Sequence, residues 1–151
     1  MIGQRLLDQN ALEKLHVRDV IERYFFAVDA RDRDALQSCF SHNAVLDYNF
    51  GAPDQGSISG GKAIAEMIFS ACVRFTASNH SVSNIQISLA TGTAEANIFA
   101  TAHVVVGDKA LVRGLRYEDG LVRNETGWLV AARRHTPLWQ IELKTTTPNF
   151  F

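Results

Sequence analysis

The chain changes its hydrophobic period near its midpoint, and this change limits the possible folds more than any other feature. Before residue 76, apolar side chains recur at the three- and four-residue spacing of helices that bury one face. After it come four runs rich in small, β-branched and aromatic residues, separated by turn sequences at 91–92, 107–108 and 124–127. Helices followed by a meander of antiparallel strands predict an α+β domain rather than a parallel sheet built from repeated strand–helix–strand units.

The first half predicts three helices and one short strand. The first helix spans about residues 11–29 with Asp8 as its N-cap, and the second begins after an N-cap at Asp32. A turn at 41–43 leads into a strand over 44–48. Residues 50–61 hold four glycines and a proline and are expected to form a loop. The third helix is predicted over about 62–75, and the later strands over 82–89 with a bulge near Ser83, 93–106, 110–123 and 128–139.

The 151 residues fit one domain, with a core over about 10–139 and a tail over 140–151. Fifteen basic and sixteen acidic residues give a net charge of −1, which argues against nucleic acid as a partner. No signal-peptide pattern and no apolar run of about 20 residues is present, so we expect a cytoplasmic protein that does not enter the membrane. Cys39 and Cys72 are expected to be buried thiols of a reducing compartment.

The sequence holds none of the common cofactor, phosphate or zinc motifs, and its five histidines lack metal-ligand spacing. We therefore expect no cofactor and no metal. Asp29 is the most unusual residue, because it lies four positions after Phe25 and shares its apolar helix face. A buried carboxylate costs several kcal/mol unless it is paired. Asp29 therefore either belongs to an inward-facing site, or caps the next turn or pairs with Arg31 or Arg33.

His80 is the natural partner for Asp29. It lies in a polar stretch where the third helix gives way to the first long strand. A carboxylate that holds one imidazole nitrogen leaves the other free as a base, and the ordinary histidine pKa of about 6.5 suits proton transfer. The alternative is a surface histidine in a polar loop.

Several segments together resemble a SnoaL-like domain of the nuclear transport factor 2-like superfamily. They are residues 19–32 (DVIERYFFAVDARD), 40–48 (FSHNAVLDY), 60–64 (GGKAI) and 116–119 (RYED) ahead of Gly127-Trp128. The resemblance covers about residues 10–139. It is strongest to the branch that holds scytalone dehydratase, hexachlorocyclohexane dehydrochlorinase and bile-acid 7α-dehydratase.

This resemblance implies a cone-shaped α+β barrel, in which a strongly curved, mostly antiparallel sheet and three helices from the N-terminal half enclose a pocket. It implies a catalytic pair at Asp29 and His80, with Tyr24 at a position that lines the site in part of the branch. Tyr48 and His103 are candidates to hold a substrate oxygen, although Tyr48 could equally be a packed strand residue. Arg123 or Arg116 could bring a cation, and strand parity allows at most one of them to point inward.

The resulting hypothesis is a cofactor-independent lyase or isomerase that moves a proton on a small, hydrophobic, cyclic substrate, with dehydration favoured. The alternative is a non-catalytic ligand-binding or assembly module of the same fold, such as a protein like the β subunit of ring-hydroxylating dioxygenases. The resemblance also implies a homodimer or homotrimer. At Leu115 and Tyr117 the chain departs from the Ser and Asn of scytalone dehydratase, which argues against scytalone itself as the substrate.

Overall fold

The computed structural model describes residues 2–50 and 53–145, which form three helices and six strands. In chain order these are α1 (Ile2–Ala30), α2 (Arg33–Ser38), β1 (Phe40–Asn49), β2 (Gln55–Ser59), α3 (Gly61–Cys72), β3 (Ala77–Ala90), β4 (Thr93–Val106), β5 (Lys109–Asn124) and β6 (Gly127–Lys144).

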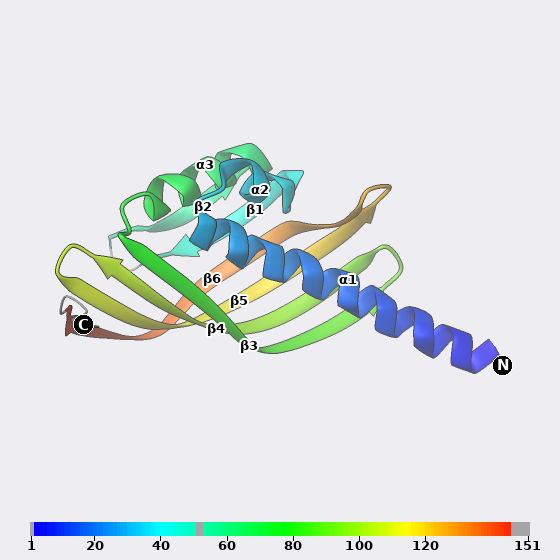
Figure 1. Ribbon diagram of the computed structural model, residues 1–151. Helices are drawn as coiled ribbons and strands as arrows, with labels where there is room; N and C mark the ends of the chain where they lie inside the picture. The colour runs from blue at the N-terminus through cyan, green and yellow to red at the C-terminus, as the bar shows by residue number, and fades with distance from the viewer. Residues whose placement is uncertain (1, 51–52, 146–151) are drawn as a thin grey trace.

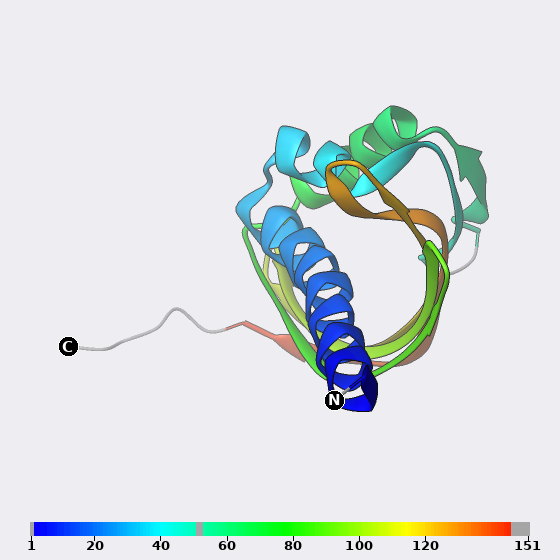
Figure 2. The same ribbon diagram turned by 90° about the vertical axis from the view of Figure 1, so that its right-hand side faces the viewer.

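The strands form one sheet in the order β2-β1-β6-β5-β4-β3. Neighbours are antiparallel except β1 and β6, which run parallel. Strands of 14 to 18 residues accumulate a large twist, so the sheet curls without closing and leaves β2 and β3 as its edges. Figures 1 and 2 show α1 lying across the concave side of this curled sheet, with α2 and α3 over β1. The α+β prediction of a strongly curved, mostly antiparallel sheet is confirmed.

Alternation along the strands separates a buried inner face from an outer face. In β4 every second residue is buried, and the intervening residues are exposed or half-buried. Four of the six inward residues of β4 are alanines (Ala94, Ala96, Ala100 and Ala102). On the same side of the sheet α1 buries Val17, Val20, Ile21 and Tyr24 in the same core cluster. Of the four alanines, Ala102 borders a cavity inside the curled sheet.

One ion pair lies at the centre of this core. Arg133 donates to Asp119 from Nε at 2.7 Å and from Nη2 at 2.5 Å, and both side chains are completely buried. The guanidinium carbon lies 4.0 Å from the centre of the Tyr24 ring and 5.0 Å from that of Tyr117. The pair thus joins β5 and β6 beneath two aromatic rings that face the cavity.

The structure extends several predicted elements. The first helix begins at Ile2, so Asp8 lies within it and is not an N-cap. This first part of α1 projects beyond the sheet (Figure 1). A helix segment that covers no core needs no apolar face, so its sequence lacks the helical periodicity used for the prediction. Asp32 does cap α2, accepting a hydrogen bond from the backbone N–H of Ala35 at 2.9 Å.

Two errors concern β1 and its neighbour. Residues 41–43 are part of β1 rather than a turn, and 55–59 form β2 rather than loop. β2 is a short, largely exposed edge strand, so it lacks the apolar alternation by which strands are recognised.

The third helix ends at Cys72 instead of residue 75, and β6 continues through 140–144 of the predicted tail. The rest of that tail, after residue 145, lies outside the described residues. The predicted bulge lies in β3 between Val82 and Ile85.

In the described part of the chain, no helix is both long enough and apolar enough to cross a membrane.

A substitution at Gly61 tests how closely α3 packs on β1. A Cβ at this position would lie 2.5 Å from the Ser41 carbonyl oxygen and 3.1 Å from the Phe40 Cβ. We expect Gly61→Ala to destabilise the fold by about 1–3 kcal/mol, because this clash outweighs the gain in helix propensity of about 1 kcal/mol. Urea unfolding measures the effect, with the exposed neighbour Lys62→Ala as control. An unchanged or raised unfolding midpoint for Gly61→Ala would contradict the packing described.

Candidate active site

The last turn of α1 and the start of β3 are joined by a two-pronged contact. Asp29 Oδ1 lies 2.7 Å from His80 Nδ1, and Asp29 Oδ2 accepts the backbone N–H of His80, also at 2.7 Å. The two side chains are mostly buried, with 8% of His80 and 20% of Asp29 exposed. The structure therefore brings together the two residues singled out in the sequence. Of the readings considered for Asp29, the pairing with His80 is the one observed.

The contact with Asp29 determines which nitrogen of the neutral His80 ring carries the proton. Burial alone would raise the pKa of Asp29, but the hydrogen bonds from the His80 ring and backbone and the attraction of the imidazole lower it below its ordinary value. Asp29 is then a carboxylate at neutral pH and can only accept, so the proton of the neutral ring lies on Nδ1. Among the described residues Nε2 has no hydrogen-bond partner. The ring thus presents a free lone pair, which is what a general base requires.

Arg31 holds the segments around the dyad in place. It is the one non-glycine residue with a positive φ (56°) in the described ranges. Its guanidinium donates to the carbonyl oxygens of Phe75 at 2.7 Å and Cys72 at 3.3 Å. These bonds tie the end of α1 to the segment that leads from α3 into β3. Arg33, the other basic residue considered as a partner for Asp29, pairs with Glu66 instead.

His80 borders a cavity of about 210 Å³ inside the curled sheet. Its apolar walls come from α1, α3, β4 and β5, with Val28, Ile68, Ala102 and Leu115 among them. Its polar lining consists of Tyr24, Asp54, Arg74, His80, Arg113, Tyr117 and His135. A second hollow of about 230 Å³ lies between α1 and β3 and reaches the same dyad past Glu22 and Asn79. A larger hollow on the outer face of the sheet, beside Asp47 and Glu118, does not touch the dyad.

Tyr24 lines the cavity together with His80, as expected. Burial raises the pKa of Tyr24 to about 12, against the opposing effect of Arg133. Burial also raises the pKa of Tyr117 well above its ordinary value. Both phenols therefore stay protonated at neutral pH, and each keeps a hydroxyl proton for a hydrogen bond.

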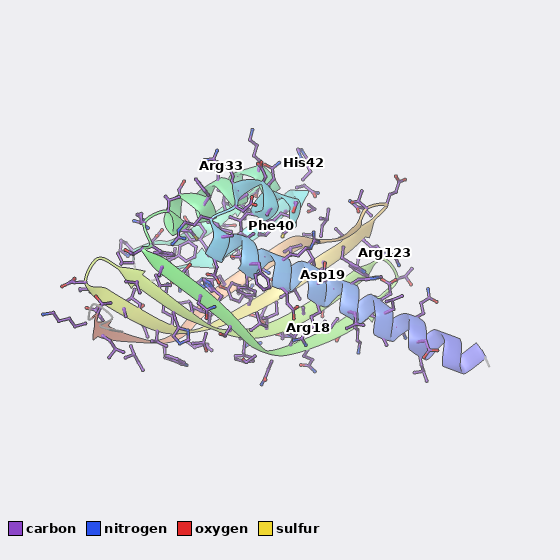
Figure 3. All side chains as sticks on the ribbon, in the orientation of Figure 1. Arg18, Asp19, Arg33, Phe40, His42 and Arg123 are labelled. Carbon is purple, nitrogen blue, oxygen red and sulfur yellow. The ribbon has the colours of Figure 1, made fainter. Side chains whose placement is uncertain are left out.

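Three other predicted site residues do not line this cavity. Tyr48 stacks on Phe50, with 5.4 Å between ring centres. His103 is exposed on the outer face of β4, because its neighbours Ala102 and Val104 occupy the inner face. Arg123 lies at the far end of β5, away from α3 (Figure 3), and donates to Glu13 of α1 at 2.7 Å. The expectation that these three side chains face the pocket is therefore corrected, and Arg116 likewise pairs with Glu118 and Asn97 outside it.

The sequence reading missed Arg113 and His135. Arg113 donates to the backbone oxygen of Phe50 at 3.3 Å. Burial, and then the charge of Arg113, lower the pKa of His135 to about 4, so this histidine is neutral at pH 7. Strand alternation could have identified Arg113, because residues two and four positions apart on a strand point to the same face. Leu115 and Tyr117, at those spacings, were already compared with site positions. Among the described residues, no group of three or more His, Cys, Asp or Glu side chains is placed to hold a metal ion.

The dyad predicts a pH-dependent contribution to stability. We expect Asp29→Asn to lower the free energy of unfolding at pH 7 by about 1 kcal/mol, a low value for a charged hydrogen bond because Asp29 is partly exposed. The lowered pKa of Asp29 means that its contribution is complete above the ordinary Asp pKa of about 4 and is lost as pH falls through the folded-state pKa. The deficit should therefore shrink when urea unfolding is repeated at pH 3. Asp19→Asn, in an exposed pair with Arg23 on the same helix, is the control; a deficit independent of pH would contradict the assignment.

Comparison with known proteins agrees with this architecture. An uncharacterised protein of Mycobacterium tuberculosis is 26% identical over 132 residues, which cover 85% of this chain and 87% of that protein. The structure of a candidate scytalone dehydratase from Novosphingobium aromaticivorans matches with a TM-score of 0.81 at 18% identity, over 95% of each chain. A hexachlorocyclohexane dehydrochlorinase, LinA-type3 from Novosphingobium barchaimii, matches with a TM-score of 0.78 at 15% identity, over 94% of this chain and 99% of its own. At such identities these structures show a shared fold. The family model of the SnoaL-like domain matches residues 9–134, and the chain therefore belongs to the SnoaL-like domain family.

Proposed function

We propose that this protein is a cofactor-independent lyase or isomerase, with His80 as the general base and Asp29 as the residue that orients and charge-balances it. The observation that carries the proposal is the 2.7 Å contact between Asp29 Oδ1 and His80 Nδ1 at the wall of a cavity of about 210 Å³. The two similar structures named above are described as a dehydratase and a dehydrochlorinase, and both words denote eliminations.

In the proposed reaction His80 Nε2 removes a proton from a carbon next to a carbonyl group. The electron pair of that C–H bond moves toward the carbonyl oxygen, and the new imidazolium is stabilised by the Asp29 carboxylate. In a dehydration the returning electrons expel hydroxide from the next carbon, and the imidazolium proton converts it to water. In an isomerisation the same proton is returned to a different carbon.

Tyr24 lines the same cavity and supports this chemistry. Its raised pKa keeps the phenol protonated, so it can donate a hydrogen bond to an oxygen on which negative charge develops. A non-catalytic binding module would be favoured by a cavity filled with side chains or by a separated dyad. The open cavity beside a hydrogen-bonded dyad instead supports the enzyme proposal.

We expect His80→Ala to lower kcat by roughly 10²- to 10⁴-fold, the usual cost of removing a general base. The assay is loss of water from small cyclic β-hydroxy ketones, followed by the absorbance of the conjugated product. His103→Ala is the matched control, since it removes an exposed histidine from the opposite face of the neighbouring strand. A His80→Ala protein that keeps the wild-type rate would rule out this mechanism.

A further inference from the structure

The register of the sheet places three cavity residues in one row. His80 of β3 is paired with Ala102 of β4, and Ala102 is paired with Arg113 of β5. Directly paired residues point to the same face, and all three line the cavity. Neighbouring strands lie about 4.8 Å apart, so the His80 and Arg113 backbones are about 10 Å apart with only a methyl group between them. A small molecule above Ala102 would have the base on one side and a guanidinium on the other.

Arg113 carries a positive charge that the rest of the described protein does not neutralise by contact. Its hydrogen bond goes to a backbone carbonyl oxygen, and no carboxylate forms an ion pair with it among the described residues. Its Nε is buried without a hydrogen-bond partner. His135, whose charge is suppressed beside Arg113, adds no second cation and leaves its own buried Nδ1 unpaired. A half-buried cation that forms no ion pair within the described protein favours the binding of an anionic oxygen of a ligand.

We propose that Arg113 is a substrate-binding residue that selects molecules with a carbonyl oxygen able to take up negative charge, held across Ala102 from His80. The inference rests on the proposed function for the role of His80. When His80 removes the proton, the C–H electron pair forms the C=C bond of an enolate, and the carbonyl π electrons move to oxygen. The guanidinium faces that oxygen and stabilises its charge, which a neutral phenol such as Tyr24 does less well. The later steps are those of the proposed elimination.

The volume of the cavity limits the size of such a molecule. A cavity of about 150 Å³ holds a benzene ring, so about 210 Å³ fits a single ring with one or two small substituents. The substrate class is therefore a monocyclic carbonyl compound with an acidic C–H bond beside the carbonyl group.

Arg74 is the other cation of the cavity lining, but it is placed differently. It is exposed, follows the end of α3, and shares the cavity mouth with the oppositely charged Asp54. It also lies outside the row formed by His80, Ala102 and Arg113. We therefore assign the selection of the oxygen to Arg113 and use Arg74 as a comparison.

The test uses 4-nitrophenol, whose phenolate stands for the enolate oxygen, and nitrobenzene, which lacks that oxygen. Titrations are made near the pKa of the phenol, where absorbance separates phenol from phenolate. The wild-type protein should bind the phenolate in preference to the phenol. Arg113→Gln should weaken phenolate binding by about tenfold or more, as loss of a charge-assisted hydrogen bond does, and leave nitrobenzene within about twofold. Arg113→Lys should keep part of the preference.

Arg116→Gln is the matched control, because Arg116 lies on the same strand but pairs with Asn97 and Glu118 on the outer face. It should bind both ligands as the wild-type protein does. The proposal is overturned if wild-type protein prefers the neutral phenol, or if Arg113→Gln changes both ligands equally or neither. It is also overturned if His80→Ala or Arg74→Gln, and not Arg113→Gln, removes the preference for phenolate. A His80→Ala protein with full turnover but intact phenolate binding would instead refute the proposed function, so the two failures can be told apart.

Discussion

The Asp29 carboxylate joins the C-terminal end of the long helix α1 to the edge of the sheet. One oxygen binds the backbone N–H of His80 and the other binds its imidazole. Because β3 is an edge strand, that N–H would otherwise lack a partner within the sheet. The carboxylate therefore satisfies an exposed edge, covers it with α1 and orients the ring in one contact. The same two hydrogen bonds thus contribute to the packing of α1 on the sheet and orient the candidate base.

The cavity exists because the sheet is long, curled and lined with small residues. Ala102 of β4 leaves room beside His80, while Tyr24 and Val28 of α1 line the cavity from the helix side. The Asp119–Arg133 pair beneath Tyr24 and Tyr117 is fully buried, so each charge depends on the other and neither can move toward the cavity without a large cost.

Local patterns in the sequence were enough to predict the helix-then-strand order, the Asp32 cap and the bulge in β3, whereas the pairing of Asp29 with His80 was favoured over its alternatives by the family resemblance. They were insufficient where the face to which a strand side chain points depends on how the sheet packs in the folded domain. His103 was a site candidate because of the family resemblance, and alternation could not correct this, because both faces of β4 contain apolar residues. The β5–β6 register also shifts between Gly114 and Leu115, and such an irregularity obscures which residues of paired strands face the same side. His135 on β6 was missed for this reason, whereas alternation with Leu115 and Tyr117 could have identified Arg113, whose strand pairs with β4 without a register shift.

The row His80, Ala102, Arg113 fixes the spacing of the two polar groups to which the proposed selectivity is assigned. The separation between the base and the guanidinium follows from strand spacing, which side-chain substitutions elsewhere in the core do not change. What can change is the residue between them, and any side chain larger than alanine at position 102 would fill the space where the ring is proposed to bind. The spacing between the base and the guanidinium is thus set by the strands, and the room between them depends on the size of residue 102.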